Sequence, residues 1–577
     1  MASPHKYLSK VAIALSLIVF VVVRIGYTSH SNRSLKVTTW DALGYYIYLP
    51  STIIYEDIKT LEWTGEIENF NELSGGKLYQ ANKNEKGDYV FKYLGGISLM
   101  QLPFFLLAHG FAILSDHPAN GFSLPYQIGI VISVFFYFLI GLLLLRKSLL
   151  TFFSDKATFI SILAITLTSN LIQYVTIDSG MSHGYIFALY CLVIWATICW
   201  HKKPRKIWAI IIGGTIGLAA ISRPTEAIML LVPLLWNTNT SMASKIKWNQ
   251  VKTNKSSILW AILAGTFAIL PQIIYWKIAS SDWIYNMGSK WQFFDPFFRV
   301  LFGYQNGWFI YTPIAFFFLL GFFYSRKHSF FWSSIITSVL TIWIVISWSD
   351  WRYGATYSCR ALVQSIPLFA FPFTAFINHC INFKYHLWIY VLLIYLTSVN
   401  FIQVYQYNER IIHPHDMNAK YFWAIYADPS PSPMDMSLLD MEKTITSPAS
   451  YESVMMLDTS NVGINAPRLE PSWVLDRTLT ESVNPKWFQV DAEILLQKGF
   501  SNCFLNLELY AEDTIIYNRI RMENPISKQN QLNKYAFTTE NRSKQIHTVR
   551  AYVGGSDSIY GRVKSLSLTA YFNREQK

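Results

Sequence analysis

The residues best suited to chemistry in this sequence are acids and bases that stand beside long apolar runs. Asp41 lies in TTWDALGYY (38–46), between Trp40 and a group of tyrosines, shortly after the first apolar run. A carboxylate close to a membrane costs free energy unless it is paired, solvated or bound to a metal. Asp41 is therefore either a functional carboxylate or an acid in the first turn of a helix at the membrane surface, where helix capping favours it.

Four further segments between apolar runs carry acids, bases and aromatic residues. They are VFKYLGG (90–96), VTIDSGMSHGY (175–185), ISRPTEA (221–227) and SWSDWRYGATYSCR (347–360). Taken singly, such residues are typical of interface anchors and loop charges, but together they gather on one side of the predicted membrane. The candidate catalytic residues are Asp41 and Asp178, and the candidate substrate-binding residues are Lys92, His183, Arg223, Arg352, Tyr353 and Arg360.

The apolar runs predict a membrane protein. The chain is 52% hydrophobic and 15% charged, whereas soluble globular proteins carry about 25% charged residues. Runs such as YQIGIVISVFFYFLIGLLLL (126–145) match the roughly 20 residues that cross a bilayer as a helix. The net charge of +12 is not gathered into one basic domain. It therefore indicates cytoplasmic loops of a membrane protein, and no nucleic-acid partner is expected.

Clusters of Lys and Arg mark the cytoplasmic loops and set the direction of each span. The run 95–114 is apolar as well, but as a span it would place Arg146 and Lys147 outside. We therefore predict that it lies at the outer surface, within a long first outer loop over 28–125. The sequence predicts about 11 membrane helices, near 8–27, 126–145, 157–174, 184–200, 207–222, 224–237, 257–276, 306–324, 329–347, 361–378 and 387–406.

The chain changes character after the last predicted span. Segments such as FQVDAEILL (488–496) alternate apolar and polar residues, which predicts strands with one buried face. An odd number of spans places these strands outside the cytoplasm. We predict a membrane domain over 1–410, a Pro/Ser-rich linker over 411–435 and a β-sandwich over 436–577. The five cysteines are widely spaced and predict no disulfide framework.

Residues 1–410 resemble the GT-C superfamily of integral-membrane glycosyltransferases. The likeness is to the bacterial branch that contains lipid A aminoarabinose transferases and relatives of protein O-mannosyltransferases. Three family features are an acid just after the first span, a lysine before an interfacial helix and an acid in the second outer loop. They match Asp41, Lys92 and Asp178. The sequence departs from the family in having no acidic neighbour of Asp41 before Glu56, and YLGG after Lys92 where the family has a proline pair.

The resemblance implies what the candidate residues do. The acid at Asp41 is central to catalysis in the family, and the lysine at Lys92 helps to hold the phosphate of the donor. A divalent cation, Mg²⁺ or Mn²⁺, is a candidate cofactor, with Asp41 and Asp178 as its candidate ligands. The C-terminal segment resembles the last strands of jelly-roll modules, many of which bind carbohydrate.

The resemblance also implies a location and a function. The protein is expected in the bacterial inner membrane, with the C-terminal domain in the periplasm. It is expected to transfer a sugar from a polyprenyl-phosphate donor to a glycan, lipid or protein outside the cytoplasm, with inversion at the anomeric carbon. Two alternatives stay open. A transporter or flippase for a lipid-linked glycan would show internal repeats and charges at mid-membrane, and a non-catalytic membrane scaffold would display a carbohydrate-binding β-domain.

Overall fold

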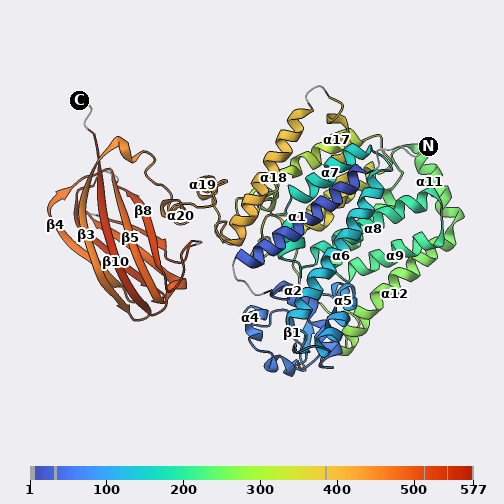
Figure 1. The fold of residues 1–577 in the computed structure, drawn as a ribbon, viewed down its shortest axis with the longest axis horizontal. Coiled ribbons are helices and arrows are strands. Elements are labelled where there is room, and N and C mark those ends of the chain that lie inside the picture. Colours follow the sequence, from blue (N-terminus) through green and yellow to red (C-terminus); the bar gives the residue numbers. More distant parts are fainter. Residues whose placement is uncertain are drawn as a thin grey trace. The chain divides into compact units, whose positions relative to one another are not determined.

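The computed structural model describes residues 7–30, 35–286, 288–383, 386–512, 514–524, 526–541 and 544–574. The chain divides into two compact units, Met1–Phe401 and Ile402–Lys577. The first unit is helical, and the second consists mainly of β-strands (Figure 1). A helical part followed by a β-domain is the class of architecture that the sequence predicts.

Seven helices in the described part of the chain are long and apolar enough to cross a membrane. They are Leu8–Ser29 within α1 (Leu8–His30), Gly96–Ile113 (α5), Leu124–Leu149 (α6), His183–Lys202 (α8), Lys255–Ser280 (α12), Arg360–Cys380 (η4, Arg360–Ser365, with α17, Ile366–Cys380) and Leu387–Asn408 (α18). Four shorter apolar helices are Lys206–Ala220 (α9), Pro224–Leu235 (η3 with α10), Ile314–Ser325 (α15) and Phe331–Ile346 (α16). The chain is an integral membrane protein by these helices, while the count of about 11 spans stays a prediction.

Two apolar segments bear on the predicted spans. Segment 95–114 forms α5, whose 18 residues reach the length of a span, although its depth in the membrane stays a prediction. α5 packs beside α6, where His109 Nδ1 lies 2.5 Å from the hydroxyl of Tyr126. The predicted span 157–174 is shorter, because α7 (Asp155–Leu167) has 13 residues and is followed by a π-helical turn, Gln173–Ile177.

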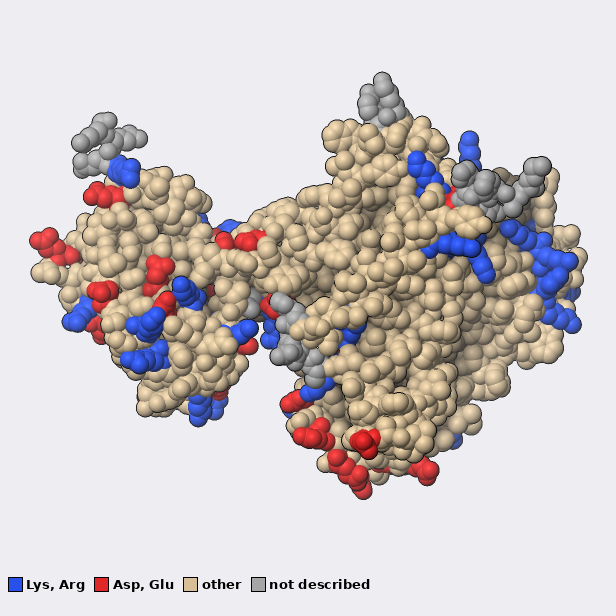
Figure 2. Space-filling model, viewed as in Figure 1, with Lys and Arg blue, Asp and Glu red and all other residues tan. Residues whose placement is uncertain are grey.

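Charged side chains are unevenly distributed over the first unit. In Figure 2, Lys and Arg gather at the end where α11 (Ser241–Thr253) lies. Asp and Glu gather at the opposite end, over the segment that contains α4 (Phe70–Ser74) and β1 (Ala81–Lys83). Lys and Arg are in excess on the cytoplasmic side of membrane proteins. The asymmetry therefore favours a cytoplasmic side at the α11 end.

The predicted first outer loop is a folded layer with its own apolar core. It contains α2 (Asp41–Tyr46), α3 (Tyr48–Ile53), η1 (Glu62–Glu66), α4 and a hairpin of β1 and β2 (Tyr89–Phe91). Buried side chains of this layer, including Leu43, Trp63 and Phe91, pack against Tyr275 of α12. Because this core anchors α2 and the hairpin to a long helix, the layer can hold side chains in fixed positions.

Two antiparallel four-stranded sheets form the second unit. Their strand orders are β3-β10-β5-β8 and β4-β9-β6-β7. Apolar side chains of both sheets, such as Phe488 of β5 and Leu507 of β6, form one buried core, because alternate residues of each strand face inward. The strands are β3 (Tyr451–Ala466), β4 (Ser472–Val483), β5 (Trp487–Lys498), β6 (Cys503–Tyr510), β7 (Ile515–Arg521), β8 (Leu532–Glu540), β9 (Ile546–Gly555) and β10 (Ile559–Asn573).

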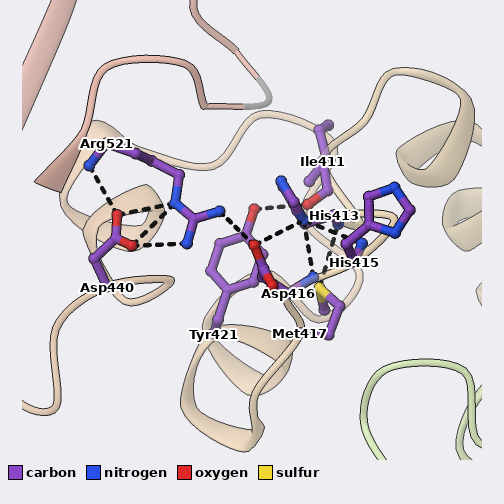
Figure 3. Close-up of polar contacts among 8 residues, drawn as sticks. All are labelled: Ile411, His413, His415, Asp416, Met417, Tyr421, Asp440 and Arg521. Carbon is purple, nitrogen blue, oxygen red and sulfur yellow. Dashed lines mark hydrogen bonds and ion pairs between the residues drawn. The ribbon is translucent and has the colours of Figure 1, made fainter. Parts of the chain in front are cut away.

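The segment predicted as a linker, 411–435, is ordered against the β-domain. It contains α19 (Ala419–Ala424) and the start of α20 (Pro433–Ser437), whose first turns are capped by Asn418 and Ser432. Figure 3 shows how Arg521 of β7 holds this segment. Its guanidinium donates to Asp440 at 2.8 Å and to Asp416 at 2.8 Å. The segment thus belongs to the second unit, to which the ion pair between Arg521 and Asp416 fixes it.

A half-buried histidine in this segment gives a pH-dependent prediction. His413 Nδ1 accepts hydrogen bonds from the backbone N–H groups of His415 and Asp416, at 3.2 and 2.9 Å (Figure 3). Burial, with Arg521 adding to it, lowers the pKa of His413 to about 4. The unfolded chain binds a proton near the ordinary pKa of about 6.5. The second unit is therefore expected to lose up to about 2 kcal/mol of stability between pH 7 and pH 5.

The matched variant is His413→Asn. An Asn Oδ1 atom is as many bonds from Cα as Nδ1 of histidine, so it can accept the same hydrogen bonds without titrating. Unfolding of the second unit is measured in the full-length protein as the urea concentration at which a protease begins to cut that unit. We expect this urea midpoint to be lower at pH 5 than at pH 7. In His413→Asn most of this fall should disappear. An equal fall in both proteins would contradict the assignment to His413.

Candidate functional site

Asp41 is the centre of a hydrogen-bonded cluster. Its Oδ2 atom accepts a hydrogen bond from Nη2 of Arg360 at 2.6 Å. Its Oδ1 atom accepts from the hydroxyls of Tyr79 and Tyr93, at 2.7 and 2.6 Å. The side chains of Asp41 and Arg360 are 19% and 15% exposed, so they form a mostly buried ion pair. The cluster joins the start of α2, the start of η4 and both flanks of the β1–β2 hairpin.

Asp41 is the first residue of α2, so the predicted position in the first turn of a helix is confirmed, but its side chain does not cap that helix. The N-cap of α2 is Trp40, and no side chain caps this helix. Trp40 has a left-handed backbone with φ 53°, and Gln80 Nε2 donates to its carbonyl oxygen at 2.9 Å. The carboxylate of Asp41 instead turns to Arg360 and the two tyrosines. Of its four or so lone-pair positions, three are used, and one is left for a ligand.

The charge state of the cluster follows from its contacts. Burial acts to raise the pKa of the Asp41 carboxyl, but Arg360 and the hydroxyls of Tyr93 and Tyr79 outweigh burial and lower this pKa below its ordinary value. Burial and the charge of Asp41 raise the pKa of both phenols, so both remain protonated donors. Asp41 is therefore a carboxylate at neutral pH, held by three donors.

A close contact of Gly44 with Tyr93 tests how strictly this geometry is needed. A Cβ atom on Gly44 would lie 2.1 Å from Cδ2 of Tyr93. Gly44→Ala must therefore displace the ring that donates to Asp41. Because misplacement of a reacting group costs up to about 100-fold in rate, we expect any reaction at this site to be at least about 10-fold slower in Gly44→Ala. Gly65→Ala is the matched control, since no atom lies within 4 Å of its Cβ position. Equal rates for both variants would contradict a positioning role of Tyr93.

Asp178 supplies a second carboxylate beside the first. Asp178 follows the π-helical turn, and among the described residues its side chain accepts one hydrogen bond, from Gln173 Nε2 at 3.1 Å. Burial raises the pKa of its carboxyl. The hydrogen bond from Gln173 and the charge of Arg360 act in the opposite direction but do not cancel this increase. A Cβ on Gly180 would lie 2.8 Å from Cβ of Ala42, so this loop lies directly against α2.

The C-terminal end of α1 holds the loop that carries Asp178. Arg24 is buried, and its Nη1 atom donates to the carbonyl oxygens of Thr176 and Ile177 at 3.2 and 3.0 Å. These residues directly precede Asp178. Arg24 therefore fixes the backbone from which the second carboxylate projects, and its charge also acts on that carboxylate.

His183 lies in a buried polar chain next to the carboxylates. Its Nδ1 atom is 2.8 Å from Oε1 of Gln364. Gln364 Nε2 donates to Glu226 at 2.9 Å, and the hydroxyl of Tyr190 also donates to Glu226, at 2.8 Å. Arg223 is half-buried and lies close enough for its charge to act on His183 and Glu226. The structure thus brings His183 and Arg223 to the same region as Asp178 and Arg360.

The other three candidates have different surroundings. The side chain of Lys92 is half-buried and has no ion-pair partner among the described residues, one position before Tyr93. Arg352 is exposed, with its guanidinium 5.2 Å from the ring centre of Trp351. Tyr353 is buried, and its hydroxyl donates to the carbonyl oxygen of Val345 at 2.6 Å. Arg352 is thus tied to its own loop, whereas the charges of Arg223 and Arg360 act on Tyr353, so Tyr353 lies closer to the cluster.

The donor set fits a divalent cation poorly. Among the described residues, no group of three His, Cys, Asp or Glu side chains is placed to hold a metal ion. Both oxygens of Asp41 accept from protein donors, and one of these is the positively charged Arg360. A divalent cation would need several oxygen ligands and would be repelled by that guanidinium. We therefore derive no step through a metal.

Several residues of the cluster escaped the sequence analysis. Tyr79, Tyr93, Gln364 and Arg24 had no motif to mark them, although Tyr93 stands next to Lys92 and Gln364 stands one helical turn after Arg360. The arginine within the first apolar run was the one available signal, because a charge inside a span is rare and often functional.

No protein-family model matches the sequence, and no curated protein is significantly similar to it. Similar solved structures include the oligosaccharyltransferase of Archaeoglobus fulgidus in the apo form (TM-score 0.44, 11% identity). They also include AglB of the same organism with an inhibitory peptide and a dolichol-phosphate (0.43, 12%) and the arabinosyltransferase EmbB of Mycobacterium smegmatis (0.25, 10%). The matches cover 73%, 73% and 78% of this chain and 57% of each of the others. All three are named as glycosyltransferases, but TM-scores below 0.5 establish neither a common fold nor a common activity.

Proposed function

We propose that this chain is a membrane glycosyltransferase that moves a sugar from a polyprenyl-phosphate donor to an extracytoplasmic glycan, lipid or protein. The observation that carries the proposal is the Asp41–Arg360 ion pair with Asp178 beside it, where the outer layer meets apolar helices. The site combines an ionised carboxylate, a second carboxylate with a raised pKa and cations that can bind phosphate. The resemblance of residues 1–410 to GT-C glycosyltransferases supports the same reaction class.

The cations of the site suit the donor phosphate. A guanidinium has five N–H donors, and the Asp41 contact uses one of those of Arg360. The remaining donors of Arg360 can bind a phosphate oxygen, and Lys92 carries a charge that no acid in the described chain neutralises. These charges would stabilise the leaving phosphate as the glycosidic bond breaks. Asp41 fixes the orientation of Arg360 in this arrangement.

Asp178 is the better placed base of the two carboxylates. A base works best when its pKa is close to the operating pH, and the pKa is raised for Asp178 and lowered for Asp41. In the proposed reaction Asp178 accepts the proton of the acceptor hydroxyl as that oxygen attacks the anomeric carbon. The bond from this carbon to the phosphate oxygen breaks, and its electron pair leaves with the phosphate. Attack opposite the leaving group inverts the anomeric centre.

The proposed orientation places the site outside the cytoplasm of a bacterium. The α11 end, rich in Lys and Arg, would face the cytoplasm, and the outer layer with α2 would face the periplasm together with the β-domain. We expect reporter fusions after residue 204 and at the C-terminus to report opposite sides of the inner membrane. The same side for both fusions would contradict this orientation.

The experiment that tests the function uses the purified full chain in lipid nanodiscs. A panel of radiolabelled polyprenyl-phosphate hexoses and pentoses is incubated with the protein, and release or transfer of the sugar is measured. We expect turnover of at least one donor, which the double variant Asp41→Asn with Asp178→Asn loses. A protein that moves the donor across the bilayer without cleaving it would instead be a flippase.

A further inference from the structure

Several buried polar atoms beside the candidate site have no hydrogen-bond partner in the described chain. Two of them belong to candidate substrate-binding residues, namely Nε2 of His183 and Nη1 of Arg223. His183 is 1% exposed, and the charge of Arg223 acts on its ring. A buried polar group without a partner is costly, so such an atom in a native structure points to a ligand or water that the group binds.

The chain of contacts behind His183 determines which hydrogen it carries. Glu226 accepts hydrogen bonds from the hydroxyl of Tyr190 at 2.8 Å and from Nε2 of Gln364 at 2.9 Å. The amide nitrogen of Gln364 therefore faces Glu226, and its carbonyl oxygen faces His183. That oxygen can only accept, so Nδ1 of His183 must be the donor of the 2.8 Å hydrogen bond.

The opposite nitrogen of the ring is then an acceptor. In a neutral imidazole that carries its hydrogen on Nδ1, Nε2 presents a lone pair. The ring of Tyr174 packs against His183 edge to face, with ring centres 4.9 Å apart, and so helps to fix the plane of the imidazole. The site thus offers a fixed acceptor at His183 and a donor at Arg223.

We propose that His183 and Arg223 together recognise a hydroxyl group of a sugar substrate, an inference that rests on the proposed function. A hydroxyl can accept from Arg223 and donate to His183. A phosphate dianion would satisfy Arg223 but offers no hydrogen to Nε2. An ammonium group would satisfy Nε2 but is repelled by the guanidinium. Among these groups a neutral hydroxyl satisfies both orphaned atoms.

The position of the pair links this hydroxyl to the reacting group. His183 begins α8, five residues after Asp178, and Gln364 lies four residues after Arg360 in η4. The charges of Arg360 and Asp41 both act on His183. The hydroxyl therefore belongs to a sugar that is bound at the Asp41–Arg360 cluster.

The first test needs no substrate. Full-length protein with ¹⁵N-labelled histidine is compared with His183→Gln, so that the signals of His183 are identified by their loss. We expect a neutral ring with hydrogen on Nδ1 and a bare Nε2. In Glu226→Gln the acceptor that orients Gln364 is weakened, and we expect the share of this tautomer to fall. Hydrogen on Nε2 in the wild type would overturn the proposal whether or not the chain transfers sugar.

The second test uses monodeoxy analogues of the polyprenyl-phosphate sugar that the panel identifies. We expect the loss of one particular hydroxyl to lower kcat/KM at least about 100-fold, because both buried atoms are then left unpaired. Hydrolysis of monodeoxy donors tests whether the recognised hydroxyl belongs to the donor sugar. Transfer to monodeoxy acceptors tests whether it belongs to the acceptor. Discrimination in either series supports the proposal. Its absence in both, in an enzyme that does turn over, would overturn it and leave the proposed function intact.

Two substitutions at His183 sharpen this test. The end atoms of Gln are as many bonds from Cα as Nε2, and those of Asn as many as Nδ1. We expect His183→Gln to keep most of the discrimination against the monodeoxy analogue and His183→Asn to lose it. If His183 has only a structural role, each variant should lower kcat/KM equally for the parent sugar and for the monodeoxy analogue. Discrimination against the monodeoxy analogue that persists in His183→Asn would contradict the assignment.

Discussion

Asp178→Asn is expected to slow sugar transfer at least about 100-fold, because general-base assistance contributes roughly 10²–10⁴-fold. The substitution keeps the size of the side chain and its ability to accept from Gln173, but it removes the basic carboxylate. Donor binding should change no more than a few-fold, since the proposed reaction assigns Asp178 to the acceptor hydroxyl and not to the phosphate. The measurement is the rate of transfer at saturating donor, with donor binding measured separately.

The pH dependence of the wild type distinguishes the two carboxylates as bases. Burial raises the pKa of Asp178, while Arg360 and two tyrosine hydroxyls lower that of Asp41 despite its burial. The rate should therefore rise with pH through a value above the ordinary Asp pKa of about 3.9. In Asp178→Asn this acidic limb should disappear from the remaining activity. If the acidic limb of the pH–rate profile lies below the ordinary Asp pKa and survives in Asp178→Asn, the base is Asp41.

Asp41→Asn is expected to reduce transfer by a similar factor and also to destabilise the protein. The change leaves the mostly buried Arg360 without its counter-charge, and breaking a buried ion pair typically costs about 3–5 kcal/mol. We expect a lower thermal midpoint of the first unit and weaker binding of the donor, because Arg360 loses its fixed orientation. Transfer rate, donor affinity and thermal midpoint are measured on the same preparation.

A matched control is available in the same outer layer. Asp57 accepts hydrogen bonds from the backbone of Lys59 and Thr60 at 3.0 and 2.8 Å and has no contact with the Asp41 cluster. Asp57→Asn should keep full activity. A moderate loss of stability is expected, because the amide NH2 group of Asn cannot accept from both the Thr60 hydroxyl and the Glu62 N–H as the carboxylate oxygen does. If Asp41→Asn behaves like this control, Asp41 has no role in the reaction, although the site around Asp178 would remain to be tested.

The sequence predicted those parts of the fold that depend on local spacing. Long uncharged runs gave the long helices, and period-two alternation gave strands such as β5. The segment 411–435 was interpreted as a linker because Pro and Ser are common in linkers. The same residue types also start helices, and here Ser432 and Pro433 form the first turn of α20. Local composition does not separate the two cases.

The candidate site was predictable where a charge stood out against apolar sequence. Asp41, Asp178, His183 and Arg360 were identified in this way, and the structure brings them together. Tyr79 and Gln364 were not identified, because polar side chains without charge are common and their partners lie far away in the chain. The Asp41–Arg360 pair also depends on the folding of distant segments, because its two members are 319 positions apart in the chain. Arg352 had the same sequence signal, but it is exposed beside Trp351.

Single-turnover cleavage of a radiolabelled polyprenyl-phosphate sugar is the sharpest test of the proposed reaction. Wild type, Asp41→Asn, Asp178→Asn and the control Asp57→Asn are compared at protein concentrations that bind all of the donor. Wild type and Asp57→Asn are expected to cleave the donor at similar rates, and the other two to cleave it at least about 100-fold more slowly. Bound donor that the wild type leaves intact, or equal rates in all four proteins, would refute the assignment of Asp41 and Asp178 to the reaction.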